Sequence, residues 1–507
     1  MIISGDRQIS YGDIHARIAR AANGFRGLGM RDGKPVGMML RNDFALFEVV
    51  AASAALGSPV VPINWHLKAD EVAYILADSG ADTLVCHADL LPQIRDGLPP
   101  EIKLLIVTTP PEIAAAYGVA PELTRVPDGM TDWDQWRDTH APLTDAPIGA
   151  APMFYTSGTT GLPKGVRRKP MRPEQMPAAA RIGAITYGVK PNEDQVILMN
   201  GPMYHSAPHS YGMLAFRNGC SIVLEPRFDP EDLLQLIERH GVTHMHMVPT
   251  MFVRLLRLPE ETRRRYDLSS LRFIIHGAAP CPVDVKRAMI EWWGPVIYEF
   301  YGSTESGAVT FATSEDALRK PGTVGKVSPG AELRFVGEDG RILPQGEIGE
   351  IYSRIAGNPD FTYHNKPEKR AEIDRDGFIT SGDVGYMDAE GYVFLCDRKR
   401  DMVISGGVNI YPAEIEAVLH AVPGVHDCAV FGIPDAEFGE ALMAVVEPQP
   451  GRVLDPMEIR TRLKASLADY KVPKHIEIQH KLPREDSGKI FKRRLRDPYW
   501  EQAGRQI

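Results

Sequence analysis

Short apolar runs alternate with helical patterns along two long stretches of this chain. In the first stretch, residues 8–105, a helical pattern over residues 11–30 precedes the strand-like run "KPVGMML". In the second stretch, residues 195–310, the run "QVILMN" precedes further helical patterns. Parallel strands need a crossover connection, which is usually a helix, so this alternation is typical of a largely parallel sheet covered by helices. The sequence therefore predicts an α/β fold.

Two strand patterns of the second stretch end in loops of small residues. "LRFIIHGAAP" enters a turn of Gly, Ala and Pro at residues 277–280, and "PVIYEFYGSTESG" enters a second loop at residues 301–307. In an open α/β sheet, ligands bind outside the carboxyl ends of the strands. We therefore expect both loops to border a ligand site.

The chain of 507 residues is too long for a single hydrophobic core. We predict a large N-terminal domain over residues 1–396, made of stacked α/β subdomains and a β-rich subdomain over residues 322–396. The charged run 397–401 has no apolar anchor and is the expected hinge, and residues 402–507 form a small α+β C-terminal domain. Residues 109–151 are rich in Pro, Ala, Asp and Thr with little periodicity, which predicts a surface connection.

Net charge, cysteine spacing and hydropathy indicate which kinds of partner the protein binds and in which cellular compartment it lies. The formal charge of −9 speaks against a nucleic-acid partner, which normally requires a basic surface. The five cysteines are scattered singly, as expected in a reducing cytoplasm rather than in a zinc site or disulfide framework. The most apolar long run, "ALFEVVAASAALGSPVVPI", carries Glu48 and two prolines and predicts a core helix and a strand rather than a membrane span. We expect a cytoplasmic protein without integral membrane association.

The segment "YTSGTTGLPKGV", residues 155–166, contains four Ser and Thr hydroxyls, three glycines and one lysine. Glycines let the backbone approach a ligand closely, hydroxyl and N–H groups donate to oxyanions, and Lys164 supplies a positive charge. The segment therefore predicts a phosphate-binding loop. It is not a Walker A loop, because Lys164 follows Pro163 and precedes Gly165. A flexible polar loop would also be rich in Gly, Ser and Thr, but flexibility does not explain the added Pro-Lys-Gly.

Four further motifs follow this loop along the chain: "YGSTESG" (301–307), "SGDVGYMDAEGY" (381–392), "DRKRDMVISGGVNIYPAEIE" (397–416) and "LPREDSGKI" (482–490). In their order and spacing, the five motifs resemble those of the ATP-dependent adenylate-forming superfamily. That superfamily includes acyl-CoA synthetases, adenylation domains of peptide synthetases and beetle luciferase. The resemblance covers essentially the whole chain. It implies that a carboxylate attacks the α-phosphorus of ATP to give an acyl-adenylate and pyrophosphate, and that a thiol then displaces AMP.

The resemblance also implies which residues bind the nucleotide. Those expected to contact the β- and γ-phosphates are Thr156, Ser157, Gly158, Thr159, Thr160 and Lys164. Those expected to form the adenine slot and the turn after it are Gly277, Ala278, Ala279, Pro280, Tyr301, Gly302 and Ser303. Glu305 corresponds to the Mg²⁺-associated acid, and Thr304 to a phosphate-binding hydroxyl. Asp383 corresponds to the acid that binds the ribose diol, with Arg398 as a second ribose and phosphate contact; taken alone, each of these charges would be an ordinary surface residue.

A lysine near the C-terminus and a small-domain rotation complete the implied mechanism. Lys489 resembles the lysine that contacts both the substrate carboxylate and the α-phosphate, which aligns the two reactants. In relatives the small C-terminal domain is mobile and rotates between the half-reactions, and its hinge falls here on Arg400, where relatives usually carry Asp or Lys. Gly406 matches the glycine that lines the pantetheine tunnel of CoA. Phe438 and Lys474 stand where relatives contact the CoA adenine and phosphate, although an exposed Phe or Lys needs no special explanation.

The segment "PMYHSAPHSYGM", residues 202–213, matches the part of the family that gates the acyl site, with His205 as the gating and catalytic histidine. The residues after His205 are Ser, Ala and Pro, so no acid is present to pair with the ammonium of an amino-acid substrate. The expected pocket residues are His205, His209, Met213, His246, Val248, Gly302 and Val309, although strand residues of this kind are mostly core. We expect an apolar acid (fatty, aryl or alicyclic), with an oxygen substituent as one option.

The motifs together predict an acyl-CoA synthetase that uses ATP, Mg²⁺ and coenzyme A. Three alternatives remain open: an enzyme that loads a carrier protein, a catalytically silent nucleotide-binding regulator, and luciferase-type oxidation. The first is disfavoured by the intact "SGGVN" tunnel motif, and the second by the joint presence of Lys489, Glu305 and Asp383. The third shares all of the motifs. Because relatives are often dimers, a homodimer is a further expectation.

Overall fold

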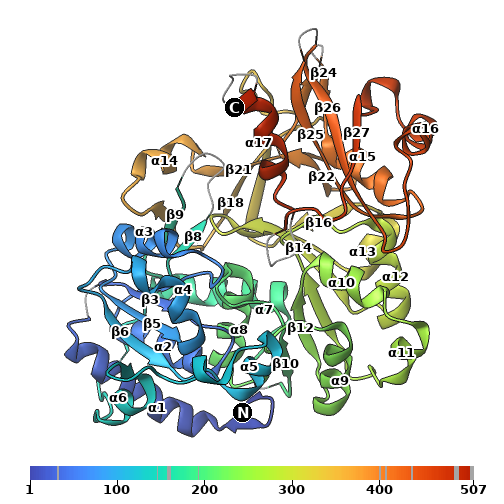
Figure 1. The fold of residues 1–507 in the computed structure, drawn as a ribbon. Coiled ribbons are helices and arrows are strands. Elements are labelled where there is room, and N and C mark those ends of the chain that lie inside the picture. The colour runs from blue at the N-terminus through green and yellow to red at the C-terminus, as the bar shows by residue number, and fades with distance from the viewer. Residues whose placement is uncertain are drawn as a thin grey trace.

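In the computed structural model, the described residues are 1–30, 33–145, 147–156, 162–191, 193–398, 401–405, 408–435, 438–484 and 490–502. Figure 1 shows the first half of the chain, in blue and green, in the lower part of the view. The C-terminal elements, in orange and red, lie above it, and α17 lies beside them near the C-terminus.

A parallel five-stranded sheet organises the N-terminal stretch, with the strand order β4-β3-β5-β6-β7 among the described residues. Its strands are β3 (Val36–Met39), β4 (Val60–Pro62), β5 (Thr83–His87), β6 (Lys103–Val107) and β7 (Thr131–Asp132). Its helices are α1 (Tyr11–Gly27), α2 (Phe44–Ala55), α3 (Ala69–Ser79), α4 (Leu91–Ile94), α5 (Pro111–Tyr117) and α6 (Trp133–Asp138). The predicted parallel α/β arrangement is confirmed, as is the core helix followed by a strand.

A second, larger sheet runs through the middle of the molecule. Its parallel part consists of β1 (Ile2–Ser4), β10 (Val196–Met199), β11 (Ser221–Leu224), β12 (His244–Met247), β13 (Phe273–His276) and β14 (Ile297–Ser303), with β2 (Arg7–Ile9) antiparallel at the edge. The helices of this part are α7 (Met176–Tyr187), α8 (Ser206–Arg217), α9 (Pro230–His240), α10 (Pro249–Leu256), α11 (Glu260–Arg265), α12 (Val283–Trp293) and α13 (Ser314–Arg319). Local sequence sets their ends: Asp229 accepts hydrogen bonds from the first backbone N–H groups of α9, and Gly241 ends that helix with φ of 60°.

Beyond β14 the large sheet becomes antiparallel, as the β-rich pattern predicts. The strands are β15 (Gly307–Ala312), β16 (Thr323–Val327), β17 (Ala331–Val336), β18 (Gly349–Ile355), β20 (Asp374–Arg375), β21 (Phe378–Met387) and β22 (Tyr392–Arg398). A separate three-stranded sheet joins β8 (Phe154–Thr156), β9 (Lys164–Arg168) and β19 (Phe361–Tyr363), and α14 (Pro367–Glu372) follows it. This small sheet carries both ends of the predicted phosphate loop.

The C-terminal elements form their own sheet and core. The strands are β23 (Val403–Ser405), β24 (Val408–Ile410), β25 (Val425–Asp435), β26 (Gly439–Pro448) and β27 (His475–Ile478), and the helices are α15 (Pro412–His420), α16 (Pro456–Ser466) and α17 (Lys492–Gln502). The core includes Ile415, Leu419, Val430 and Leu463, all buried. The predicted α+β character of this part is confirmed.

The surface connection predicted over residues 109–151 is wrong in part, because this segment contains α5, β7 and α6. Trp133 and Arg137 of α6 are buried, and both donate to the buried carboxylate of Glu48 on α2 at 2.9 Å. The stabilising partner lies far away in the sequence, so the local pattern does not show these helices.

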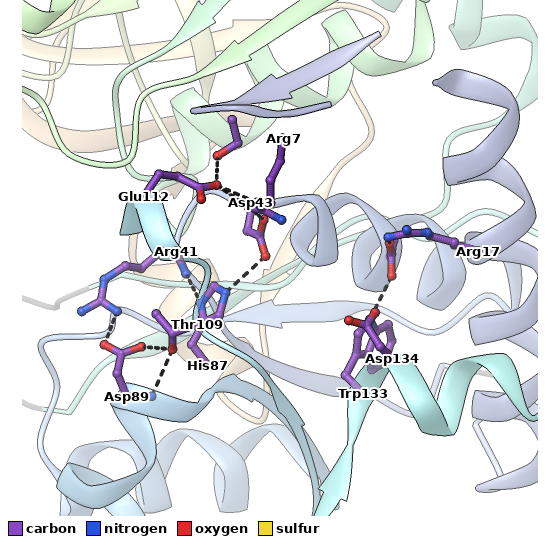
Figure 2. A network of polar contacts seen from close by, with 12 residues as sticks. Arg7, Arg17, Arg41, Asp43, His87, Asp89, Thr109, Glu112, Trp133 and Asp134 are labelled. Atoms are coloured by element: carbon purple, nitrogen blue, oxygen red, sulfur yellow. Dashed lines mark hydrogen bonds and ion pairs between the residues drawn. The ribbon is translucent and has the colours of Figure 1, made fainter. Parts of the chain in front are cut away.

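A polar network ties the first hairpin to the N-terminal sheet (Figure 2). Arg7 on β2 donates to Asp43 at 2.6 Å and also pairs with Glu112 on α5. Asn42, the residue before Asp43, donates to the carbonyl of Gly201 at 2.9 Å and accepts from the backbone N–H of Met203 at 3.0 Å, in the same loop between β10 and α8. The network therefore positions the loop that leads into α8.

Among the described residues, no helix is long and apolar enough to cross a membrane. The five cysteines, Cys86, Cys220, Cys281, Cys396 and Cys428, carry free thiols.

Candidate active site

The turn after β13 and the end of β14 lie side by side at the carboxyl ends of the parallel strands of the large sheet, because the two strands pair in parallel. Close packing demands small residues there. A Cβ at Gly302 would lie 1.9 Å from the carbonyl oxygen of Gly307, and one at Gly277 would lie 2.8 Å from the ring of Phe300. Ala278 has φ of 69°, in the left-handed region. Ala279 and Pro280 complete this turn. The sequence thus correctly placed both small-residue loops at one edge.

Glu305 lies where three separate segments of the chain meet. Tyr363 of β19 donates its hydroxyl to Glu305 Oε1 at 3.0 Å, and the hydroxyl of Thr156, at the end of β8, is 3.5 Å from the same oxygen. The ammonium of Lys164, at the start of β9, lies 4.7 Å from the centre of the Tyr363 ring. Burial and the charge of Glu305 raise the pKa of Tyr363, so its phenol stays protonated and donates. The arrangement brings one cation, one carboxylate and two hydroxyls together.

Arg168 fixes the backbone of the turn that carries Glu305. Its guanidinium donates to the carbonyl oxygens of Thr304 at 2.6 Å and Glu305 at 3.0 Å, and to that of Pro359 at 3.1 Å. Burial lowers the pKa of Arg168 from its ordinary value, although the charges of nearby acids oppose this effect. Sequence reasoning missed both Arg168 and Tyr363, because their partners are distant along the chain and neither residue belongs to a recognised motif.

The start of α8 approaches the same turn. Ser206, the first residue of the helix, shares a hydrogen bond of 2.9 Å with the hydroxyl of Thr304. His205 is the N-cap of α8, and its ring centre lies 4.3 Å from that of Tyr204. The predicted gating histidine and the predicted phosphate-binding hydroxyl therefore belong to neighbouring segments, joined through Ser206, which sequence reasoning did not single out.

Tyr301 and Asp383 are brought together from different strands. The Tyr301 hydroxyl donates to Asp383 Oδ2 at 2.8 Å, which links β14 to β21. The backbone of Arg398 on β22 pairs with that of Asp383. Ser303 receives its support locally, since its backbone N–H donates to Ser306 Oγ at 3.0 Å. The residues predicted to hold adenine and ribose thus share one region of the large sheet.

The predicted acyl-pocket residues lie on α8, β12, β14 and β15 and around the start of α10. His209 and Met213 are buried on α8, His246 on β12 and Val309 on β15, whereas Val248, the N-cap of α10, is half-buried. His209 Nδ1 is 3.0 Å from the carbonyl of Met203, so Nδ1 carries the proton. Burial lowers the pKa of His209 and of His246 to about 4, which makes both imidazoles neutral at pH 7.

An aromatic cluster surrounds His246. Its ring centre lies 6.1 Å from that of Tyr211 on α8 and 6.0 Å from that of Phe300 on β14, and Tyr187 contacts Tyr211 and Phe300 at 5.6 and 6.1 Å. His246 Nε2, His209 Nε2 and the Tyr211 hydroxyl are buried without a hydrogen-bond partner among the described residues. Buried polar groups normally have a partner, so each of these three atoms has an unused hydrogen-bonding capacity. Sequence reasoning missed Tyr211, because residues two apart on a helix, such as His209 and Tyr211 on α8, do not share a face.

Two predicted CoA-contact residues meet at Asp435 in the C-terminal sheet. Lys474 donates to Asp435 Oδ2 at 2.6 Å, and the backbone N–H of Phe438 donates to Asp435 Oδ1 at 3.0 Å. The Phe438 side chain is exposed. Asp435 was not predicted, and its position at the end of β25 explains how it holds both neighbours.

The remaining predicted residues lie outside the described part of the chain. They are Ser157, Gly158, Thr159, Thr160, Arg400, Gly406 and Lys489.

Family models, sequence relatives and solved structures all match this chain over most of its length. The AMP-binding enzyme family model matches residues 1–358, and the model of the AMP-binding enzyme C-terminal domain matches residues 414–489. A feruloyl-CoA synthase from Amycolatopsis sp is 34% identical over 511 residues, which cover 97% of this chain and 94% of that protein. The fatty acid–[acyl-carrier-protein] ligase ScoC from Streptomyces coeruleorubidus is 30% identical over 523 residues, which cover 100% and 94%. The structure of the anthranilate CoA ligase AuaEII in complex with anthranoyl-AMP matches with a TM-score of 0.86 at 26% identity, over 99% of this chain and 94% of that chain. The family and the fold class predicted from the motifs are confirmed.

Proposed function

The chain belongs to the AMP-binding enzyme family, and from this premise we propose that its acyl-CoA synthetase activity joins an apolar carboxylic acid to CoA through an acyl-adenylate. The acid would attack the α-phosphorus of ATP and release pyrophosphate, and the CoA thiol would then displace AMP. The observation that carries this proposal is the convergence of Thr156 and Tyr363 on Glu305, with the Lys164 ammonium over the Tyr363 ring. Phosphoryl chemistry needs such positioning and charge stabilisation rather than a protein nucleophile.

Glu305 fits the role of a Mg²⁺ ligand. Its Oε1 lies beside two hydroxyl oxygens, at 3.0 Å for Tyr363 and 3.5 Å for Thr156, and oxygen donors are what this ion prefers. When bound, Mg²⁺ neutralises charge on the phosphate oxygens. The chain's own residues do the rest: Arg168 holds the turn of Glu305 through its carbonyl groups, and Lys164 supplies a second positive charge for the phosphates.

The roles of the C-terminal residues rest on the family resemblance. We assign Lys489 to the contact with the acid and the α-phosphate, and Gly406 to the pantetheine tunnel. Residues 397–401 would act as the hinge around Arg400, between a domain of residues 1–396 and a mobile domain of residues 402–507. The cluster around Asp435 supports a CoA-binding role for Lys474 and Phe438, because one carboxylate holds both the Lys474 ammonium and the backbone of Phe438, whose side chain is exposed.

We infer that the acid is apolar and carries one hydrogen-bonding oxygen. The aromatic cluster supports an aryl or alicyclic body, and the unpartnered atoms of His246 and Tyr211 support an oxygen substituent. Replacing Tyr211 with phenylalanine should lower kcat/KM by roughly ten-fold for a hydroxylated aryl acid and leave it unchanged for the deoxy analogue. An unchanged preference between the two acids in both Tyr211→Phe and His246→Ala would contradict this assignment.

The general test is AMP release across a panel of fatty, aryl and alicyclic acids, with and without CoA. We expect acid-dependent AMP formation that CoA accelerates. Acid-dependent formation that CoA leaves unchanged would favour a carrier-protein acceptor, the acceptor named for ScoC. Oxygen consumption or light would indicate luciferase-type chemistry, and the absence of AMP with every acid would favour a regulator. The Lys489→Ala variant should lose acyl-adenylate formation; a wild-type rate would refute the mechanism.

We propose a cytoplasmic location and a homodimer. ATP and CoA as substrates and the five free thiols support a reducing compartment. Sedimentation equilibrium of the purified protein tests the dimer, and a monomer mass would refute it.

A further inference from the structure

One face of α3 contacts both ends of the predicted phosphate loop. Tyr74 and Asp78 are four residues apart on this helix, so they lie on the same face. The Tyr74 hydroxyl donates to the carbonyl of Pro163 at 3.0 Å, and the Tyr155 hydroxyl donates to Asp78 Oδ2 at 2.7 Å. Tyr155 precedes residues 157–161 and Pro163 follows them, and Figure 1 shows α3 beside β8 and β9.

A second segment, the turn after β19, connects to the same face of α3. Lys366 donates to the Tyr74 hydroxyl oxygen at 2.9 Å, and the Asn365 amide donates to the carbonyl of Asp78 at 3.0 Å. The backbone N–H of His364 donates to the carbonyl of Gly165 at 2.7 Å. Segments from three distant parts of the sequence therefore meet at the two ends of one loop.

The hydrogen bonds of Tyr74 and Asp78 are separate from the contacts that pack α3 into the core. The helix buries Val72, Ile75, Leu76 and Ser79 in the N-terminal core, whereas Tyr74 and Asp78 lie half-buried outside that set. The hydrogen bonds also form a chain in which the Lys366 ammonium polarises the phenol that donates to Pro163. Contacts that fix the two ends of a binding segment preorganise it, and preorganisation lowers the entropic cost of binding.

We propose that Tyr74, Asp78 and Lys366 are positioning residues for ATP, which hold the two ends of the phosphate loop in a binding-competent arrangement. This inference rests on the proposed function, because it assumes that residues 157–161 bind the ATP phosphates. It assigns to α3 and to the turn after β19 a role in nucleotide affinity, without any contact between these residues and the acid.

The test compares two tyrosine variants that lose the same kind of hydrogen bond. Tyr74→Phe removes the bond to Pro163 and the acceptor of Lys366, whereas the control Tyr11→Phe removes a bond of 2.7 Å to the carbonyl of Cys220, outside the α3 contacts. The dissociation constant of ATP, measured by titration calorimetry without acid, should rise about 3- to 10-fold in Tyr74→Phe and stay unchanged in Tyr11→Phe. The KM for the acid should stay unchanged in both.

Asp78 supplies a second, independent comparison. Asp78→Asn keeps an oxygen that accepts from Tyr155, so it should retain most of the ATP affinity, whereas Asp78→Ala removes the acceptor and should weaken binding. The thermal midpoint of each variant is measured alongside. Equal ATP affinity in the wild type, Tyr74→Phe and Asp78→Ala overturns the proposal, as does a loss of affinity in Tyr11→Phe that matches that in Tyr74→Phe. If wild-type protein binds ATP but activates no acid, the proposed acyl transfer fails while this comparison still gives a result.

Discussion

Replacing Asp43 with asparagine tests the energetics of the network in Figure 2. Asp43 accepts from Arg7 at 2.6 Å and faces His87 Nε2 at 3.4 Å. The backbone N–H of Arg41 donates to His87 Nδ1 at 3.1 Å, so the ring proton lies on Nε2 and points to Asp43. The substitution keeps the size of the side chain and removes its charge.

The pKa of Asp43 gives the contribution of its carboxylate to the free energy of unfolding. Burial alone raises this pKa, but the hydrogen bond from His87 and the charge of Arg7 outweigh burial and lower it from 3.8 to about 2. At about 1.4 kcal/mol per pH unit, the ionised carboxylate contributes about 2.5 kcal/mol to the free energy of unfolding at pH 7. Because the pKa is lower in the folded state, this contribution is complete above the unfolded pKa and is lost as the pH falls through the folded pKa. About 1 kcal/mol of it disappears between about pH 5 and about pH 3.

Urea unfolding followed by tryptophan fluorescence at several pH values measures this effect. We expect Asp43→Asn to be less stable than the wild type by about 2–3 kcal/mol at neutral pH, and the difference to fall by about 1 kcal/mol near pH 3. The control is Asp6→Asn, since the Asp6 side chain is fully exposed and its ion pair with Arg239 is 3.8 Å long; this variant should match the wild type at every pH. If the difference in free energy of unfolding between Asp43→Asn and the wild type does not change with pH, the ionised Asp43 carboxylate does not stabilise the fold as proposed.

Three further substitutions test the site and the core. Tyr363→Phe keeps the ring under Lys164 but removes the donor to Glu305, so it should raise the Mg²⁺ concentration needed for half-maximal AMP release by about 3- to 10-fold; an unchanged Mg²⁺ titration would contradict this role. Arg168→Met leaves the carbonyls of the Glu305 turn without their donor and should lower kcat for pyrophosphate release by at least about ten-fold, with a smaller change in the KM for the acid; a change confined to that KM would argue against it. Arg137→Met leaves the buried Glu48 carboxylate with only the Trp133 donor and a longer ion pair of 3.4 Å to Arg17, so it should cost about 3 kcal/mol in urea unfolding, and a second substitution, Glu48→Gln, should restore part of this loss.

The sequence predicted the parts of the fold that local patterns determine. Strands such as β12 and β13, and the small-residue loop at residues 277–280, follow from apolar runs and turn residues. The short helix α6 was missed because its two buried side chains are stabilised by Glu48 on α2, more than eighty residues away. Periodicity over a few residues does not carry such long-range information.

In the candidate site too, some residues could be predicted from sequence motifs and others only from the structure. Glu305 and Asp383 were located through their motifs, and so was Tyr301, which donates to Asp383. Arg168 and Tyr363, which hold Glu305, were found only through the structure. Tyr363 and Arg168 reach Glu305 only because β19 pairs with β9 across nearly two hundred residues of sequence. A single sequence contains no signal for that pairing.

The small sheet β8–β9–β19 shows how strand geometry arranges the described residues of the candidate phosphate site. Side chains alternate along a strand, so Lys164, Val166 and Arg168 of β9 point to the same face. Val166 is buried there, Lys164 reaches the Tyr363 ring, and Arg168 reaches the turn of Glu305. The register pairs Tyr363 with Val166, which places the phenol between the two cations along the strand. A shift of one residue would turn both cations to the opposite face and expose Val166, so the joint burial of Val166, Phe361 and Tyr363 favours the register on which the cation, the phenol and the carboxylate depend.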